Sequence, residues 1–195
     1  MNTLKVCVFS SSSDAIEQIY VDEAVKLAGL IGQSGKTLVN GGANVGLMEK
    51  MLIAAKRSGG STIGIIPEKL KQFGLESKNA DEIIVAKDMM ERKAIMRNLS
   101  DAFVAIPGGF GTLEEILEVI TLKQLDYHQK AIVFLNTNSF YDDMFRQFER
   151  SYDENFAKPT YRNLYQIVST SKEVIDYLES YKPSECAYKW YKVPS

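Results

Sequence analysis

The segment that most constrains the fold is an apolar strand that runs into a glycine-rich turn and then a helix. Ala102 to Ile106 is a continuous apolar run of strand length, and Pro107 ends it. Gly-Gly-Phe-Gly-Thr-Leu-Glu-Glu follows, and an apolar stripe with helical spacing begins within it: Leu113, Ile116, Leu117 and Ile120. The sequence therefore predicts a strand-to-helix turn of the kind found in α/β folds.

This turn favours an anionic ligand. Gly108, Gly109 and Gly111 allow positive φ and let a ligand approach the backbone amides closely. A helix start adds amides without an intrahelical acceptor and a partial positive charge. The alternative is structural, because Thr112 and Glu115 have the spacing of a capping box, in which each side chain satisfies an exposed amide. The turn alone leaves both interpretations open.

Length and composition suit one α/β domain. The chain has 195 residues, 45% of them hydrophobic, which is enough for one substantial core. We expect a single domain over residues 1–195 with an aromatic tail at about 181–195. The net charge of −2 disfavours a nucleic-acid partner. Two cysteines, Cys7 and Cys186, argue against a disulfide framework and suit a reducing cytosol.

Two further absences in the sequence shape our expectations. No signal-like or membrane-spanning apolar run is found, so we expect a cytoplasmic protein without membrane contact. The single histidine, His128, precedes a predicted strand, and we interpret it as a surface-loop residue. Metal-ligand spacings such as CxxC and HxxxH are lacking, so we expect no metal site.

Strand and helix patterns alternate along the chain. Strands are predicted at 4–9, 37–39, 63–66, 83–86, 102–106 and 131–135, and near 167–168; helices are predicted at 14–33, from 46 to about 58, from about 88, after the turn at 107–111, after 140, and around 172–178. The polar segment from 68 to 81 is predicted to be a flexible loop near a site. This order predicts an α/β fold, a three-layer sandwich with a mainly parallel sheet and helices on both faces.

Such sheets bind ligands outside the carboxyl ends of their strands. Besides the turn after Ile106, the Ser10–Ser13 turn and the glycine-rich turn Gly41–Gly46 are predicted at that edge. The first strand leads into serines rather than GxGxxG, and the chain contains no GxxxxGK[ST] motif. A dehydrogenase and a P-loop NTPase are therefore disfavoured.

A charged residue interrupts the apolar stripe of the helix that begins near Asp88. Arg92 shares a face with Met96 and Leu99. One interpretation is structural: the stem packs on the core and the guanidinium reaches water or a carboxylate. The other is functional, because a planar fork of donors suits a phosphate or a developing negative charge. Lys93 would then supply a second cation.

Three motifs in this order resemble the LOG (LONELY GUY) family, formerly labelled lysine decarboxylase: Gly-Gly-Ala-Asn-Val-Gly-Leu-Met at 41–48, Met-Met-Glu-Arg-Lys at 89–93, and Pro-Gly-Gly-Phe-Gly-Thr-Leu-Glu-Glu at 107–115. The resemblance extends from the first strand to Phe134-Leu135-Asn136 and Tyr141. No lysine motif for pyridoxal phosphate is found, so we reject the decarboxylase label and expect no cofactor.

The resemblance implies a Rossmann-like homodimer that cleaves a cytokinin riboside 5'-monophosphate to a free base and ribose 5-phosphate; some relatives accept AMP. It implies that Arg92 and Glu115 are the catalytic pair, that Gly108, Gly109, Gly111 and Thr112 hold the phosphate, and that Lys93 and Thr121 contact the substrate. We expect the rest of the substrate site among the other motif residues and the serine turn: Phe110, Glu114, Gly41, Gly42, Gly46, Met89 and Ser11.

The chemistry of these residue types agrees with that implication. Breaking an N-glycosidic bond passes through a cationic, oxocarbenium-like ribosyl centre, which a carboxylate stabilises. Glu115 would act as nucleophile or as the base that activates water, and the residues leave that choice open. Arg92 would orient the substrate and stabilise charge on the leaving group or phosphate, while the glycine-rich turn holds the phosphate as a handle.

Four positions depart from the family's usual motifs: Asn40, Ala43, Glu49 and Met90. If position 43 needs positive φ, the Cβ of Ala43 costs energy, and Glu49 brings negative charge near a helix that should face an anion. We therefore expect hydrolysis to persist with a changed base preference or rate. Alternatives are a non-catalytic carrier of a nucleotide or phosphorylated pterin, and a hydrolase of another modified nucleotide.

Overall fold

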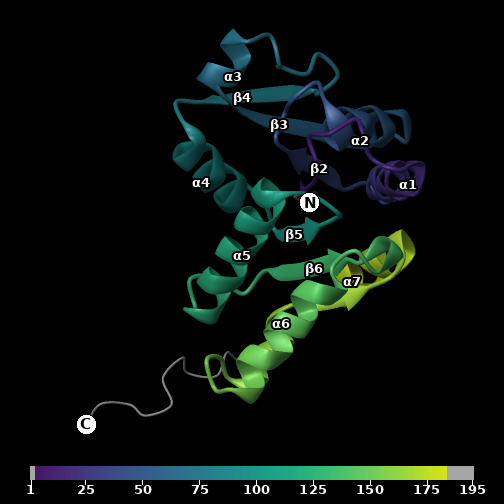
Figure 1. The fold of residues 1–195 in the computed structure, drawn as a ribbon. Coiled ribbons are helices and arrows are strands. Elements are labelled where there is room, and N and C mark those ends of the chain that lie inside the picture. Colours follow the sequence, from purple (N-terminus) through teal and green to yellow (C-terminus); the bar gives the residue numbers. More distant parts are fainter. Residues whose placement is uncertain (1–2, 184–195) are drawn as a thin grey trace.

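The computed structural model describes residues 3–183 and contains one seven-stranded sheet. The strands lie in the order β4-β3-β2-β1-β5-β6-β7, and neighbouring strands are parallel (Figure 1). Their bounds are β1 (Lys5–Phe9), β2 (Thr37–Asn40), β3 (Ser61–Pro67), β4 (Glu82–Ala86), β5 (Ala102–Ala105), β6 (Ala131–Leu135) and β7 (Gln166–Val168). The predicted parallel sheet is confirmed. Tyr188, Trp190 and Tyr191 of the predicted tail, and Cys186, lie outside the described residues.

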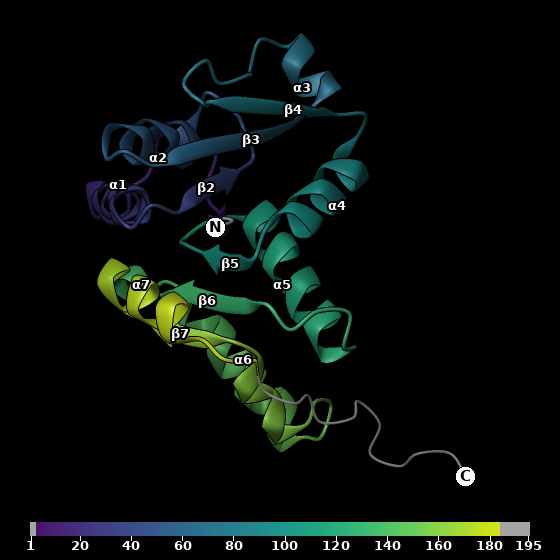
Figure 2. The same cartoon turned by 180° about the vertical axis from the view of Figure 1, so that it is seen from behind.

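Helices cover both faces of the sheet, as the sequence predicts. Figures 1 and 2 show α1, α2 and α7 on one side and α4 and α5 on the other. The helices are α1 (Gln18–Gln33), α2 (Gly46–Arg57), α3 (Glu68–Gln72), α4 (Met89–Leu99), α5 (Phe110–Gln124), α6 (Asp142–Asp153) and α7 (Ser171–Ser180), with 3₁₀ turns η1 (Thr137–Ser139) and η2 (Pro159–Leu164). Among residues 3–183, no helix combines the length and apolar character needed to cross a membrane.

The core is divided by the sheet into two apolar layers. Successive side chains of a strand point to opposite faces, so Val6 and Val8 pack in the layer under α1 and α2, whereas Cys7 and Phe9 pack in the layer under α4 and α5. Because both faces are covered, the central strands are continuous apolar runs. The rings of Phe9 and Phe103 stack in the second layer at 6.0 Å between centroids.

The strand order reverses beside β1. The chain runs from β1 outward through β2, β3 and β4, and then returns to pair β5 with the other side of β1. The carboxyl ends of β1, β2 and β5 therefore meet at one place on the sheet edge. This reversal brings together the serine turn, the Gly41–Gly46 turn and the Pro107–Gly109 turn, and it is where open α/β sheets bind ligands.

Two predictions about local structure are wrong. Helix α1 begins at Gln18 rather than Asp14, because the Asp14 carboxylate accepts a hydrogen bond from Gly46 N at 3.2 Å and pairs with Lys50, which draws it towards the neighbouring turn. The segment 68–81 is not a plain loop: it contains α3, and Ser77 N donates to Gly42 O at 2.9 Å. That backbone pairing holds the segment against the glycine-rich turn.

His128 lies in the loop between α5 and β6, as predicted, but its side chain packs against the core instead of standing at the surface. The side chain is half-buried, and its ring packs 5.6 Å from the ring of Phe103. Lys130 N donates to Nδ1 at 3.2 Å, so Nε2 carries the proton and donates to Val119 O at 3.0 Å. Both nitrogens of the neutral ring are thus satisfied, and burial lowers the His128 pKa to about 4.

Candidate functional site

The centre of the site is a buried ion pair between α4 and α5. Arg92 Nη1 donates to Glu115 Oε1 at 2.7 Å, and the two residues are only 8% and 9% exposed. Arg92 Nε donates to Ile65 O at 3.0 Å, at the carboxyl end of β3. The stripe position predicted for Arg92 therefore aims its guanidinium at a carboxylate on the neighbouring helix. The structure brings together the two residues that the sequence predicts as the catalytic pair.

Two opposing effects act on the pKa of Glu115 in this pair. Burial raises the pKa of the Glu115 carboxyl, and the Arg92 guanidinium opposes that rise by attraction and by its hydrogen bond. A carboxylate with a raised pKa beside a fixed cation can accept a proton from water or stabilise a nearby cation. The arrangement therefore has the properties of a reactive carboxylate. Burying both charges also costs desolvation energy, so stabilising the fold is a weak reason for having this ion pair here.

Lys93 belongs to a second charged group on the same two helices. Its ammonium contacts Glu114 and lies 3.5 Å from Glu118 Oε2, while Arg97 Nη1 lies 2.9 Å from Glu118 Oε1. The hydrogen bond to Glu114 is the main reason that the pKa of Lys93 is raised. Lys93 and Glu114, both predicted site residues, therefore pair with each other beside the Arg92–Glu115 pair.

The turn after β5 presents an open backbone surface. Helix α5 begins at Phe110 after the N-cap Gly109, and Leu113 N makes an intrahelical bond to Gly109 O. The preceding first-turn amides have no acceptor within the helix. A Cβ at Gly109 or Gly111 would meet no atom within 4 Å, so a ligand can approach the backbone there. An anion fits this end of the helix.

Gly108 is a glycine for a different reason. A Cβ at Gly108 would lie 2.1 Å from Thr112 Oγ1, so the Thr112 side chain occupies that space and is itself buried. The capping-box interpretation of Thr112 and Glu115 is wrong, because Gly109 is the N-cap and no side-chain cap bond forms. Glu115 turns to Arg92 instead.

The turn after β2 is built from three glycines with distinct surroundings. Gly42 and Gly46 have φ of 66° and 59°, in the left-handed region that favours glycine. A Cβ at Gly41 would lie 2.2 Å from Arg92 Nη2, so the turn touches the guanidinium directly. Gly46 packs against the backbone of Ser11 and Ser12, and Ser11 O accepts from Leu47 N at 3.0 Å. The serine turn and the glycine-rich turn thus form one continuous edge.

Two motif departures have effects different from those predicted. Ala43 is not among the residues with positive φ, so its Cβ causes no such strain; it forms a bridge to Glu76. The carboxylate of Glu49 accepts from Ser77 Oγ at 2.5 Å and from Asn79 Nδ2 at 2.5 Å. Glu49 therefore holds the 74–79 segment over the turn rather than facing an anion.

Three further predicted residues make no contact that ties them to the ion pair in the part of the chain that the structure describes: Met89, Phe110 and Thr121. Met89 is half-exposed, and Phe110 is 92% exposed at the tip of the β5 turn. Thr121 lies more than one turn farther along α5, where its hydroxyl donates to Leu117 O at 2.8 Å. It lines a groove of about 190 Å³ between α5, α6 and η2. A contact between Thr121 and the substrate therefore stays a prediction.

Sequence reasoning missed one group that contacts Arg92, the Ile65 carbonyl, and it named Asn40 only as a motif departure without its structural role. The Ile65 carbonyl holds Arg92, and no sequence signal identifies a backbone acceptor of this kind. Asn40 is fully buried at the end of β2, and its position as a polar residue ending an apolar strand is a signal for a structural role. Within residues 3–183, no group of three or more His, Cys, Asp or Glu side chains is placed to hold a metal ion.

Comparisons with known proteins identify the family. The family model described as "Possible lysine decarboxylase" matches residues 38–178. The cytokinin riboside 5'-monophosphate phosphoribohydrolase LOG5 of Arabidopsis thaliana is 39% identical, over 92% of this chain and 78% of its own length. A probable enzyme of the same name, LOGL2 of Oryza sativa subsp. japonica, is 38% identical over 92% of this chain and 73% of its own.

Solved structures share the fold. The molybdenum cofactor binding protein of Rippkaea orientalis aligns with a TM-score of 0.72 and 26% identity, covering 92% of this chain and 98% of its own. The molybdenum cofactor carrier protein of Chlamydomonas reinhardtii aligns with a TM-score of 0.71 and 21% identity, covering 91% and 97%. At that identity the second likeness shows the fold alone. With the family model and the plant relatives taken together, this chain belongs to the LOG family.

Proposed function

We propose that this protein is a phosphoribohydrolase that cleaves the N-glycosidic bond of a cytokinin or adenine nucleoside 5'-monophosphate and releases the free base and ribose 5-phosphate. The observation that carries the proposal is the buried Arg92–Glu115 pair beside an open helix start. Names of relatives at 36–39% identity support the reaction.

Glu115 is the group that meets the ribosyl cation. As the base-to-sugar bond breaks, positive charge develops on the ribosyl carbon, and a nearby carboxylate stabilises it. The carboxylate then either bonds to that carbon or takes a proton from the attacking water. Burial raises the pKa of Glu115, and Arg92 favours its ionised form by opposing that effect.

The 5'-phosphate is the handle that places the ribose. The amides at the start of α5 and the open faces of Gly109 and Gly111 bind phosphate oxygens. Binding energy from the phosphate holds the reacting bond against Glu115, which is why a nucleoside without phosphate is a poor substrate. This makes the protein a nucleotide-binding protein.

We also propose that the protein is a homodimer in the cytoplasm. Met90 and Phe110 are 79% and 92% exposed near the starts of α4 and α5, and a second copy would cover such apolar side chains. The family resemblance supports this assembly. The buried free thiol of Cys7 suits a reducing compartment.

A second candidate is a non-catalytic carrier. The likeness to the Rippkaea orientalis cofactor-binding protein at 26% identity favours it, because that protein has the same fold over nearly its whole length. The carrier predicts tight binding without turnover, and it gives no role to a reactive carboxylate.

The test is a panel of substrates assayed for free base and ribose 5-phosphate. It contains AMP, isopentenyladenine riboside 5'-monophosphate, other purine monophosphates and the corresponding nucleosides. The proposal expects release from one of the first two. Release only from other monophosphates would show that the substrate belongs to another class of nucleotide. Tight binding with no release from any member of the panel would support the carrier.

A further inference from the structure

The turn after β2 confines the guanidinium of Arg92 at the nitrogen that does not bond Glu115 or Ile65. Nε is bonded to Ile65 O, and Nη1 is bonded to Glu115. The third nitrogen, Nη2, faces Gly41 so closely that a Cβ there would lie 2.2 Å away. The position of the guanidinium therefore depends on where the Gly41–Gly42 backbone lies.

Asn40 holds that backbone in place. Its side chain is 0% exposed, and it uses both ends of its amide: Oδ1 accepts from Gly42 N at 2.9 Å, and Nδ2 donates to Met48 O at 3.0 Å. One bond closes the turn and the other ties it to the first turn of α2. Since buried amide groups are costly to leave unpaired, these two bonds fix the turn strongly.

The same turn is locked to the strand that holds Arg92 Nε. A Cβ at Gly64 would lie 2.6 Å from Gly42 Cα, so β3 and the turn are in direct backbone contact. Gly64 precedes Ile65, whose carbonyl accepts from Arg92. A shift of the Gly41–Gly42 turn therefore moves both the Gly41 backbone that faces Arg92 Nη2 and the Ile65 carbonyl that accepts from Arg92 Nε.

We propose that Asn40 is a positioning residue for Arg92: by fixing the Gly41–Gly42 turn, it presses the guanidinium onto Glu115. The consequence for activity rests on the proposed function, whereas the consequence for the ion pair does not. Loss of the Asn40 side chain frees the turn, and the guanidinium withdraws from the carboxylate.

The titration of Glu115 reports this withdrawal. The groups that face its carboxylate are Arg92 and Lys93 on α4, Glu114 on its own helix and Cys7 on β1. Burial raises the Glu115 pKa, and Arg92 is the principal group that lowers it. Arg92 touches the turn that Asn40 holds, so the Glu115 pKa rises further when Asn40 is removed.

The experiment is a carbon-13 NMR titration of the Glu115 carboxyl in the wild type and in Asn40→Ala, assigned with Glu115→Gln. We expect Asn40→Ala to raise the Glu115 pKa by about one unit. The acid limb of the kcat/KM profile should move with it, and kcat should fall about tenfold with a smaller change in KM. Asn44→Ala is the matched control: this exposed side chain of the same turn donates to Gly74 O at 3.0 Å, and its removal should leave both pKa and profile at the wild-type values.

Two further variants keep the test decisive if Asn40→Ala folds poorly. Asn40→Ser retains an acceptor for Gly42 N and should give a smaller rise. Gly41→Ala leaves Asn40 in place but displaces the guanidinium, and it should raise the Glu115 pKa as Asn40→Ala does. A lower melting temperature with an unshifted Glu115 titration in the folded Asn40 variants would overturn the proposal and leave Asn40 a purely structural residue. If the wild type cleaves no nucleotide yet the pKa shifts appear, the proposed function fails and this inference stands.

Discussion

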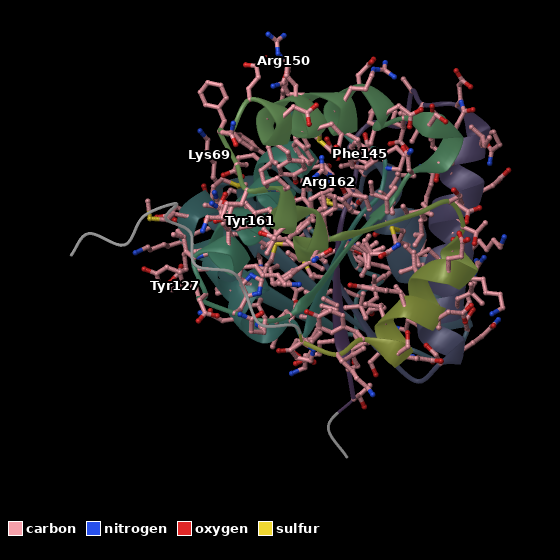
Figure 3. The ribbon with its side chains drawn as sticks, turned by 90° about the horizontal axis from the view of Figure 1, so that it is seen from below. Lys69, Tyr127, Phe145, Arg150, Tyr161 and Arg162 are labelled. Atoms are coloured by element: carbon pink, nitrogen blue, oxygen red, sulfur yellow. The ribbon has the colours of Figure 1, made fainter. Side chains whose placement is uncertain are left out.

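Arg92 and Glu115 come from adjacent helices on one face of the sheet and meet at 2.7 Å between Nη1 and Oε1, in surroundings that exclude most solvent. A second arginine–carboxylate contact in the same molecule provides a comparison. Arg162 Nε donates to both carboxylate oxygens of Glu149 at 3.0 Å, but both of these side chains are exposed. This pair joins η2 to α6, and Figure 3 labels Arg162 and the α6 residue Phe145. The two pairs allow the same substitution to be made inside and outside the site.

Arg92→Lys should reduce kcat/KM for the nucleotide about 100-fold, because an ammonium cannot reach Ile65 O and Glu115 together as the guanidinium fork does. Steady-state rates of base release measure this. Arg162→Lys is the matched control, and its rates should equal those of the wild type. Equal rates for the wild type and Arg92→Lys would remove Arg92 from the chemistry.

The rate should fall on the acid side at a pH above the usual titration range of a glutamate. Glu115 acts in its ionised form, and burial raises its pKa, so protonation inactivates the enzyme at a higher pH than for an exposed carboxyl. The pH dependence of kcat/KM measures the value in the free protein. An acid limb that persists unchanged in Glu115→Gln would assign it to another group.

Gly109→Asp should weaken nucleotide binding selectively. A Cβ at this position meets no atom, so the fold is retained, while the carboxylate stands at the helix start that we assign to the phosphate. The KM for AMP should rise about 10- to 100-fold, and the slow cleavage of adenosine should be unchanged. Parallel assays of AMP and adenosine check this, and an equal loss for both would place the phosphate elsewhere.

His128 should make the folded state less stable below neutral pH. Its pKa is lowered to about 4 in the folded protein, from 6.5 for a free histidine, so the unfolded chain binds more protons between those values. The contribution of His128 to the free energy of unfolding is therefore fully present above pH 6.5 and is lost as the pH falls towards 4. The loss should be about 1–2 kcal/mol, a discounted value because the ring is only half-buried.

Urea unfolding of the wild type and His128→Gln across this range measures the effect. The chain has one histidine, so the variant removes the whole contribution of that residue type. The difference in the free energy of unfolding between the two proteins should narrow as the pH falls from 6.5 to 4. A constant difference would show that the ring titrates alike in both states.

The sheet and its covering helices could be predicted from the sequence because the apolar pattern specifies them directly. Val6 and Val8 face one layer and Cys7 and Phe9 the other, so β1 has the continuous apolar run of a strand buried on both faces. The start of α1 could not be predicted, since Asp14 turns to Lys50 and Gly46, which are distant in sequence. The segment 68–81 was missed for the same reason: its order comes from Glu49 and the Gly42 backbone.

Site residues could be predicted from the sequence where a charged side chain stands on an apolar stripe or directly after a glycine-rich turn. Arg92 stands on an apolar stripe, and Glu115 follows a glycine-rich turn, so each was identifiable alone. Their partnership is a tertiary contact between α4 and α5, which the local pattern does not encode. The Ile65 carbonyl accepts from Arg92, and Asn40 bonds the turn whose Gly41 faces the guanidinium; only the packed sheet shows these contacts.

The most direct test of the central claim is phosphorus-31 NMR of AMP, and in a second sample of isopentenyladenine riboside 5'-monophosphate, mixed with the wild-type protein and with Glu115→Gln. Our account predicts that the nucleotide signal of at least one substrate is replaced by that of ribose 5-phosphate in the wild-type sample. In the Glu115→Gln sample it predicts a rate lower by at least about 100-fold. Glu149→Gln, which alters the exposed pair, should convert the nucleotide at the wild-type rate. A nucleotide signal that broadens on binding but never converts in the wild-type sample would contradict the account and favour a carrier.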